Sequence, residues 1–520
     1  MAFAATETTV EVTNFDDDQP GCDEMTDDKQ ALIDDFVAVL PRVFQRDFTV
    51  FGGDPDEVCN RLNWLVAPDV TDVSALDAFA SQLDAIGVDH VVLCGMGGSS
   101  LYPRTLLPYH SATRKVTVVD TTHPDVLRHI DETLHYPSSL FVFASKSGST
   151  AETTAMRTFF TSRLHATTPD AQNRLAVITD PDSSLAKEAT EQQFGQILLA
   201  DPDVGGRFSA HTLFGVTVSA LAGLDVKAHL DAAKRAYTAL AVADEHNVAI
   251  RLAAQLATAV KRRGSVAQVE VQLHGTDGTF GLWIEQLLVE SLGKDGVGVH
   301  VVSAPATAPC DVILTVKQNA ALALPSLEEN GTHATLSVPD GHHGIAMAAA
   351  VMMLATALAG RGIQVNPFDQ PDVAAAKQAT DEALAARRAL PPPRDVRDVL
   401  AEVPSGTPLI ILAYVAPDSP DEQHMRRAAK ALGQQRHTTV TVGVGPRYLH
   451  STGQLHKGAF ANACYLVIGP SFTTDLAIAD DTFTFGELIL AQAAGDVAAL
   501  TARGRQVHVI TAEGLHAHVS

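Results

Sequence analysis

One segment of the chain reads Leu140-Phe141-Val142-Phe143-Ala144 and continues as Ser145-Lys146-Ser147-Gly148-Ser149-Thr150-Ala151-Glu152. The apolar run predicts a buried strand, and the hydroxyl-rich run predicts a turn that opens a helix. Backbone N–H groups and side-chain hydroxyls converge in such a turn, which suits a phosphate group. We therefore expect a strand, an anion-binding turn and a helix at this point of the chain.

A second turn of the same kind lies about fifty residues earlier. The strand-like run His90–Cys94 is followed by Gly95-Met96-Gly97-Gly98-Ser99-Ser100. Glycine-rich turns after strands are weak signals singly. Two of them in one αβ array suggest a phosphorylated small molecule as ligand.

Apolar, β-branched runs recur along the chain with helical stretches between them, as is typical of parallel strands covered on both faces. We expect strands at 91–93, 116–119, 140–143, 175–178, 267–273, 299–302, 312–314, 334–338, 409–412, 440–442 and 465–468. The predicted fold class is α/β, with two doubly wound parallel-sheet domains and a C-terminal α/β unit. Pro391-Pro392-Pro393 marks the clearest boundary. The predicted divisions are an acidic N-terminal segment 1–60, domains 61–244 and 245–388, and the unit 394–520.

Composition narrows the possible partners. The 37 basic and 61 acidic residues among 520 give a net charge of −24, which argues against a nucleic-acid or anionic-membrane surface.

Five cysteines without a close pair favour a reduced, cytoplasmic compartment, and an acidic N-terminus without early cations predicts no export. The apolar stretch Gly344–Gly360 predicts a helix buried between layers, with a membrane span as a remote alternative. The histidine spacings predict no metal site.

Several side chains are candidates for chemistry. Glu290 lies in the last turn of a predicted helix at 282–292, where partial burial and the helix dipole raise its pKa toward that of a general base; an exposed helix-end glutamate is the alternative. Arg207 follows two glycines and offers an always-charged fork to an oxyanion. Lys377 follows the turn Asn366–Pro371, and a solvated surface lysine is the alternative there. His450 and His456 share a polar loop that is either acid–base machinery or a capped turn, and the pair His342-His343 is a third histidine candidate.

In this order, five motifs resemble the glucose-6-phosphate isomerase family of sugar-isomerase domains. They are Gly95–Ser99, Ser145–Glu152, Gly205–Arg207, Glu290–Lys294 and Asn366–Lys377. The Arg447–Gly458 loop and Phe483–Gly486 further resemble the isomerase half of bacterial transaldolase/isomerase fusions.

The resemblance implies interconversion of glucose 6-phosphate and fructose 6-phosphate through a cis-enediol, with no metal and no other cofactor. It implies that Glu290 is the base, that Arg207 stabilises the enediolate, and that Lys377 assists ring opening or holds a sugar oxygen. The implied substrate-binding residues are Gly97, Gly98, Ser99, Ser145, Ser147, Ser149, Thr150 and Gln370. Members of the family are commonly homodimers.

The histidine position departs from the family pattern. Most members carry the ring-opening histidine between the glutamate and lysine motifs, whereas His450 and His456 follow Lys377. We expect the C-terminal unit to supply it, with His456 slightly preferred. Two other functions stay open: an isomerase that also accepts mannose 6-phosphate, and a non-catalytic sugar-phosphate-binding regulator.

Overall fold

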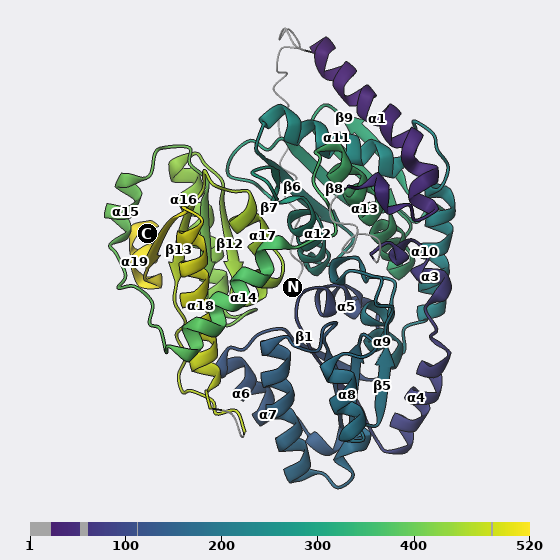
Figure 1. Ribbon diagram of the computed structural model, residues 1–520, viewed down its shortest axis with the longest axis vertical. Coiled ribbons are helices and arrows are strands. Elements are labelled where there is room, and N and C mark those ends of the chain that lie inside the picture. The colour runs from purple at the N-terminus through teal and green to yellow at the C-terminus, as the bar shows by residue number, and fades with distance from the viewer. Residues whose placement is uncertain (1–21, 53–60, 112, 480–481, 520) are drawn as a thin grey trace, which may run out of the picture.

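The computed structural model describes residues 22–52, 61–111, 113–479 and 482–519. It contains three parallel-sheet units, arranged in Figure 1 with the first below, the second above and the C-terminal unit at the left. The acidic run Asp16–Asp18, on which part of the N-terminal prediction rests, lies outside the described residues. Helix α1 (Cys22–Phe44), by contrast, lies against α11 of the second unit, and Lys29 Nζ donates to Gln255 Oε1 over 2.7 Å.

The first unit is a five-stranded, all-parallel sheet in the order β2-β1-β3-β4-β5. Its strands are β1 (His90–Gly95), β2 (Lys115–Val119), β3 (Ser139–Ala144), β4 (Leu175–Thr179) and β5 (Gln196–Leu199). Its helices are α3 (Ala67–Val70), α4 (Ser74–Ala85), α5 (Leu101–Leu106), α6 (Pro124–Thr133), α7 (Ala151–Thr167), α8 (Ser184–Glu191) and α9 (Leu213–Leu221). Every residue of β3 is buried, as the apolar run predicts for a central strand.

The second unit has the sheet order β7-β6-β8-β10-β9, with β9 antiparallel to β10. Its strands are β6 (Val266–His274), β7 (Gly298–Ser303), β8 (Val312–Gln318), β9 (Ser326–Asn330) and β10 (His333–Val338). Its helices are α10 (Val226–Leu240), α11 (Val248–Arg263), α12 (Gly278–Leu292) and α13 (Gly341–Gly362). Helix α10 packs on α13, so the predicted limit at 244 separates two helices that lie together.

The C-terminal unit has a four-stranded parallel sheet in the order β12-β11-β13-β14. Its strands are β11 (Leu409–Ala413), β12 (Val440–Val444), β13 (Cys464–Ile468) and β14 (Gln506–Ile510). Its helices are α15 (Val396–Glu402), α16 (Pro420–Arg436), α17 (Gly453–Gly458), α18 (Phe485–Ala502) and α19 (Ala512–Val519), and α14 (Pro371–Ala385) lies along α18 (Figure 1). The predicted limit at 388 therefore places α14 apart from the helix it packs on.

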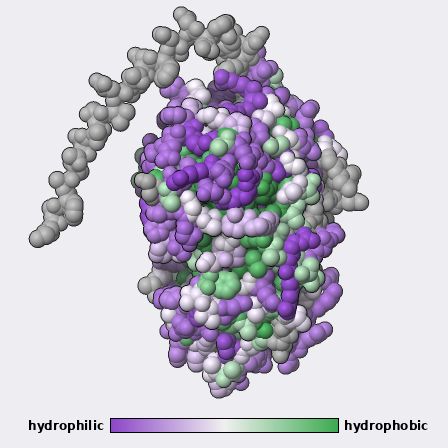
Figure 2. All heavy atoms as spheres, turned by 90° about the vertical axis from the view of Figure 1, so that its left-hand side faces the viewer, coloured by the Kyte–Doolittle hydropathy of each residue, from purple (hydrophilic) through white to green (hydrophobic). Residues whose placement is uncertain are grey.

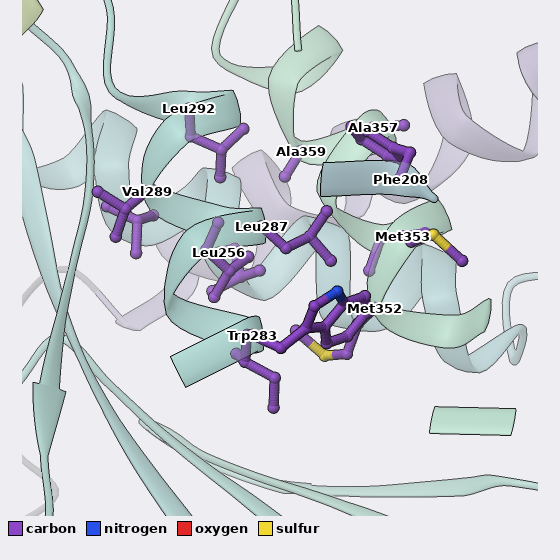
Figure 3. Packing of buried hydrophobic residues seen from close by; sticks show 14 of the residues in the cluster. Phe208, Leu256, Trp283, Leu287, Val289, Leu292, Met352, Met353, Ala357 and Ala359 are labelled. Carbon is purple, nitrogen blue, oxygen red and sulfur yellow. The ribbon is translucent and has the colours of Figure 1, made fainter. Parts of the chain in front are cut away.

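The largest core lies in and around the second unit. In Figure 3, Trp283 and Leu287 of α12 lie close to Met352 and Met353 of α13. Helices α13 and α18 have the length and composition of a membrane span, but 94% and 67% of their apolar windows are buried inside the protein. The prediction of a buried helix at 344–360 is confirmed by this burial. The face formed by the C-terminal unit is mostly hydrophilic, with hydrophobic residues in a band across its middle (Figure 2).

Three ion-paired side chains join the C-terminal unit to the first unit. The buried carboxylate Asp120, at the end of β2, pairs with Arg104 at 3.1 Å and with Arg447 at 2.8 Å. Burial would raise the pKa of Asp120, but the two guanidinium groups hold it below its usual value. Since Arg447 begins the segment that carries His450, this cluster fixes that segment against the first sheet.

Candidate active site

The candidate site lies where β1 and β3 end. In the order β2-β1-β3-β4-β5 the chain changes direction between β1 and β3, and ligands of open parallel sheets bind at such switch points. The glycine turn after β1 and the serine turn after β3 therefore meet at one rim. This confirms the expected strands before both turns.

The glycine turn fits against its neighbours without room for side chains. Gly97 has φ +56°, and a Cβ there would lie 2.8 Å from the His450 carbonyl oxygen. A Cβ on Gly98 would lie 2.0 Å from the Gly206 carbonyl oxygen. The two glycines thus allow the turns that carry His450 and Arg207 to approach β1 closely.

The serine turn presents hydroxyl groups in pairs. Ser145 Oγ lies 3.0 Å from Thr150 Oγ1, and Ser147 Oγ lies 3.1 Å from Ser149 Oγ. Gly148 adopts φ +72°, so the chain reverses there at no steric cost. The turn leads into α7, whose first backbone N–H groups have no partners within the helix.

Lys377 lies at this serine turn. Its Nζ donates to the Ser149 carbonyl oxygen over 3.1 Å and to Ser149 Oγ over 3.3 Å, although its side chain is exposed. Gln370 precedes the helix that carries Lys377, and Ser99 ends the glycine turn; both are half-buried. This placement suits neutralisation of a phosphate better than contact with the sugar ring.

Glu290 is buried on α12, which begins at Gly278, four residues before the predicted start. Its carboxylate accepts from Gln286 Nε2 over 3.0 Å and from Arg207 Nη1 over 3.4 Å. Burial raises the pKa of Glu290, while Arg207 and Gln286 lower it and leave a net upward shift. The predicted upward shift is thus present, and the alternative of an exposed glutamate is excluded.

Arg207 is held by four hydrogen bonds. Nε donates to Ser291 Oγ over 2.7 Å, and Nη2 donates to the carbonyl oxygens of Pro367 and Asp369 over 2.6 and 3.1 Å. Together with the hydrogen bond from Nη1 to Glu290, four of the five N–H groups of Arg207 have hydrogen-bond partners. The fifth, on Nη1 next to Glu290, can serve an oxygen of a bound molecule.

His450 pairs with a second buried carboxylate. Its Nε2 lies 2.7 Å from Glu152 Oε1, which also accepts from Gln492 Nε2 over 2.6 Å. Burial alone would lower the pKa of His450, but the Glu152 charge raises it above its usual value. Glu290 acts on His450 in the same direction, so the imidazole is poised as a proton donor.

His456 lies elsewhere. It is buried, with its ring 5.5 Å from that of Tyr465 and 6.0 Å from that of Tyr448, and burial lowers its pKa well below the usual value. The geometry thus brings His450, and not the preferred His456, to Glu290. His342 stacks on the His229 ring at 5.6 Å, in another part of the core.

Two charged residues of the site carried no predicted role. Glu152 closes the serine motif, but its partners His450 and Gln492 lie about 300 residues away in the sequence, so no local signal identifies the pairing. In the sequence, Lys294 is recognisable only as a residue that follows the end of a helix. In the structure its buried Nζ pairs with Asp369 at 2.7 Å and donates to the Asn366 carbonyl oxygen, and burial lowers its pKa to about 8.

Across the described ranges, no three His, Cys, Asp or Glu side chains are grouped closely enough to hold a metal ion. The site itself contains the carboxylate, imidazole, guanidinium and ammonium groups described above. These groups can bind an anion, move a proton and stabilise an oxyanion.

Known proteins resemble part of this chain. The family model described as phosphoglucose isomerase matches residues 81–316. The glucose-6-phosphate isomerase of Rubrobacter xylanophilus is 31% identical over 232 residues, which cover 42% of this chain and 54% of that protein. That of Thermus thermophilus is 33% identical over 230 residues, or 43% of this chain and 54% of that protein. The alignments thus span about half the length of these relatives.

Two solved structures share the fold. A hypothetical protein from Thermus thermophilus superposes with a TM-score of 0.58 at 25% identity, covering 70% of this chain and 98% of its own. A glucose-6-phosphate isomerase from Chlamydia trachomatis gives a TM-score of 0.56 at 17% identity, covering 72% and 88%. The predicted α/β class with two sugar-isomerase-type sheets is confirmed. Residues 81–316 include Arg207 and Glu290 but not Lys377 or His450.

Proposed function

We propose that this chain interconverts glucose 6-phosphate and fructose 6-phosphate by proton transfer through a cis-enediol. The observation that carries the proposal is the buried Glu290 carboxylate, bonded to Arg207 and beside the His450–Glu152 pair. A regulator that only binds sugar phosphate needs the serine turn but no buried base. The matches to isomerase relatives support the same reaction.

In the proposed mechanism, the phosphate group lies at the serine turn. Hydroxyls of Ser145, Ser147, Ser149 and Thr150 and the N-terminus of α7 would bind its oxygens. Lys377 would neutralise part of its charge from Ser149, and Ser99 and Gln370 would border it. The glycines Gly97 and Gly98 would let the sugar approach the backbone.

The proton transfers fall to two residues. His450, held by Glu152, would donate a proton to the ring oxygen as the sugar opens. Glu290 would then remove a proton from C2 and return it to C1, or the reverse. The remaining N–H of Arg207 would stabilise the negative charge on the enediolate oxygen, and its four bonds to the protein hold it in place for this.

The test replaces the proposed base. Glu290→Gln keeps the shape of the side chain and its place beside Arg207 but cannot accept the proton, so we expect turnover of fructose 6-phosphate in a coupled assay with chelator present to fall about 1000-fold. Glu285→Gln, on the same helix, is the matched control and should stay within about threefold. Unchanged turnover in Glu290→Gln would refute the assignment.

Four finer points belong to the same proposal. The Arg447–Gly458 loop and Phe483–Gly486 suggest kinship with the isomerase half of transaldolase fusions. The chain would also form a homodimer, and light scattering would measure its mass in solution. Cytoplasmic location follows from the proposed metabolic role. Turnover of mannose 6-phosphate within about tenfold of the glucose ester would establish dual specificity.

A further inference from the structure

A cavity of about 570 Å³ lies between the second unit and the C-terminal unit. Its walls come from α12 and β7 on one side and from β12 and α16 on the other, and β7 and β12 lie next to each other in Figure 1. This volume falls within the range of small-molecule binding sites. The cavity does not include Glu290 or the serine turn, so it is separate from the candidate active site.

The walls combine apolar surface with unsatisfied polar atoms. Apolar lining residues include Val271, Leu282, Val301, Val440 and Val442. Among the described residues no hydrogen-bond partner exists for His300 Nδ1, His456 Nδ1 or Thr452 Oγ1, which are buried in the same walls. These three atoms expose almost no surface, so they do not contact an occupant, and the cavity offers an occupant mainly the apolar side chains named above.

Two cations of α16 line the cavity, together with the carboxylate of Glu285. Arg426 and Lys430 lie four residues apart, hence on one face of the helix, and both line the cavity. Arg426 is oriented by Glu422, with Nη2 to Oε1 at 2.7 Å. Arg426 is balanced by Glu422 and lies near Glu285, so Lys430 is the charge in this wall that favours an organic anion next to the apolar side chains.

The cavity also touches the elements that carry the proposed catalytic groups. Glu285 of α12 lines it, one residue before Gln286, whose Nε2 donates to Glu290 and to the His450 carbonyl oxygen. Arg447, Ser451 and Thr452 line it from the segment that carries His450. A molecule in the cavity would therefore lie against both the helix that carries Glu290 and the segment that carries His450.

We propose that this cavity binds an organic anion with an apolar body and a phosphate or carboxylate head group, and that its occupancy changes the rate at the Glu290 site. Binding of the anion does not depend on which reaction the chain catalyses. The effect of occupancy on the rate rests on the proposed isomerase function.

Binding is tested on the full chain with 1-anilinonaphthalene-8-sulfonate as a fluorescent apolar anion, in the presence of fructose 6-phosphate to occupy the serine turn. We expect Arg426→Gln/Lys430→Gln to weaken binding at least about tenfold, because two charge-assisted contacts are lost. The matched control, Arg397→Gln/Arg427→Gln, removes two exposed arginines that do not line the cavity and should bind as the wild type does. Equal binding by all three proteins, or equal loss in both variants, would overturn the site.

Competition identifies the head group. Phenyl phosphate and phenylacetate share one apolar ring, so preferential displacement by one of them assigns phosphate or carboxylate. Displacement by neither would overturn the proposed ligand class. The coupling is tested by the kcat of fructose 6-phosphate turnover with the better competitor. We expect at least a twofold change in the wild type and none in Arg426→Gln/Lys430→Gln; binding without any change in kcat would keep the site and overturn the coupling.

Discussion

Two glutamates on one helix, Glu285 and Glu290, have the same chemistry and different surroundings. Burial raises the pKa of both, that of Glu285 to about 7. Glu290 is bonded to Arg207 and Gln286 and acts electrostatically on His450, whereas Glu285 faces the cavity near Arg426. A raised pKa thus does not identify a catalytic base. The proposed role of Glu290 as the base rests instead on its hydrogen bonds to Arg207 and Gln286 and on its position near His450.

One side of α12 carries Glu290 near His450, and the other carries Glu285 at the cavity that His456 also lines. The largest expected difference between the two sides is in the effect of replacing these histidines. His450→Gln should reduce turnover of fructose 6-phosphate about 100-fold, because the proton donor for ring opening is lost. His456→Gln, on the cavity side, should stay within about threefold. Both rates are measured in the coupled assay.

An acyclic substrate separates ring opening from proton transfer. The esterified O4 of erythrose 4-phosphate cannot close a ring, so deuterium exchange at its C2 should be within about threefold of wild type in His450→Gln. Loss of exchange equal to the loss of turnover would assign His450 to the proton-transfer step instead. A larger loss in His456→Gln than in His450→Gln would reverse the comparison of the two sides.

A smaller effect is expected on stability at Glu285. Its raised pKa means that the folded state binds a proton more tightly than the unfolded chain, so stability falls as pH rises from about 4.5 to about 7. Glu285→Gln removes this loss and should be about 1–2 kcal/mol more stable than wild type above pH 7, and equal to it below pH 4.5. Urea unfolding at several pH values measures the difference.

The control for this experiment is the exposed Glu328, whose replacement by Gln should leave the pH dependence of unfolding unchanged. If Glu285→Gln instead loses stability at pH 8, the carboxylate is held by partners as firmly as Glu290 is. The two glutamates would then not differ in the way described.

The smallest expected effect tests what holds Glu290. The amide of Gln286 lowers the pKa of Glu290, so Gln286→Met should raise it and move the acid limb of the kcat/KM profile to higher pH by about 0.5–1 unit. The exposed Gln423→Met serves as control. If the acid limb of the kcat/KM profile lies at the same pH in Gln286→Met as in the wild type, a group other than Glu290 controls the profile.

The sheets were largely predictable from the sequence because buried parallel strands are continuous apolar runs. Each of the eleven expected strands lies within an observed one. The missed strands are β5, β9 and β14, whose half-exposed residues break the apolar pattern. Helix α12 was predicted four residues short because its first turn contains two glycines, Gly278 and Gly281.

The site was predictable only where a motif is local. The serine turn and Glu290 follow from neighbouring residues, but the burial of Glu152 and Lys294 depends on partners from distant parts of the chain. The positions of the two histidines were not predictable for the same reason. Its loop places His450 at Glu152 and leaves His456 against Tyr465, and no spacing within the loop distinguishes the two.

The contact between His450 and Glu152 joins residues 298 positions apart. A nascent chain that has already folded its first sheet still lacks this histidine, and a product truncated at the three prolines could never acquire it. Proteolysis or premature termination near residue 391 would therefore remove the proposed proton donor together with helix α18, on which α14 packs. If the proposed mechanism holds, activity would appear only at the end of synthesis.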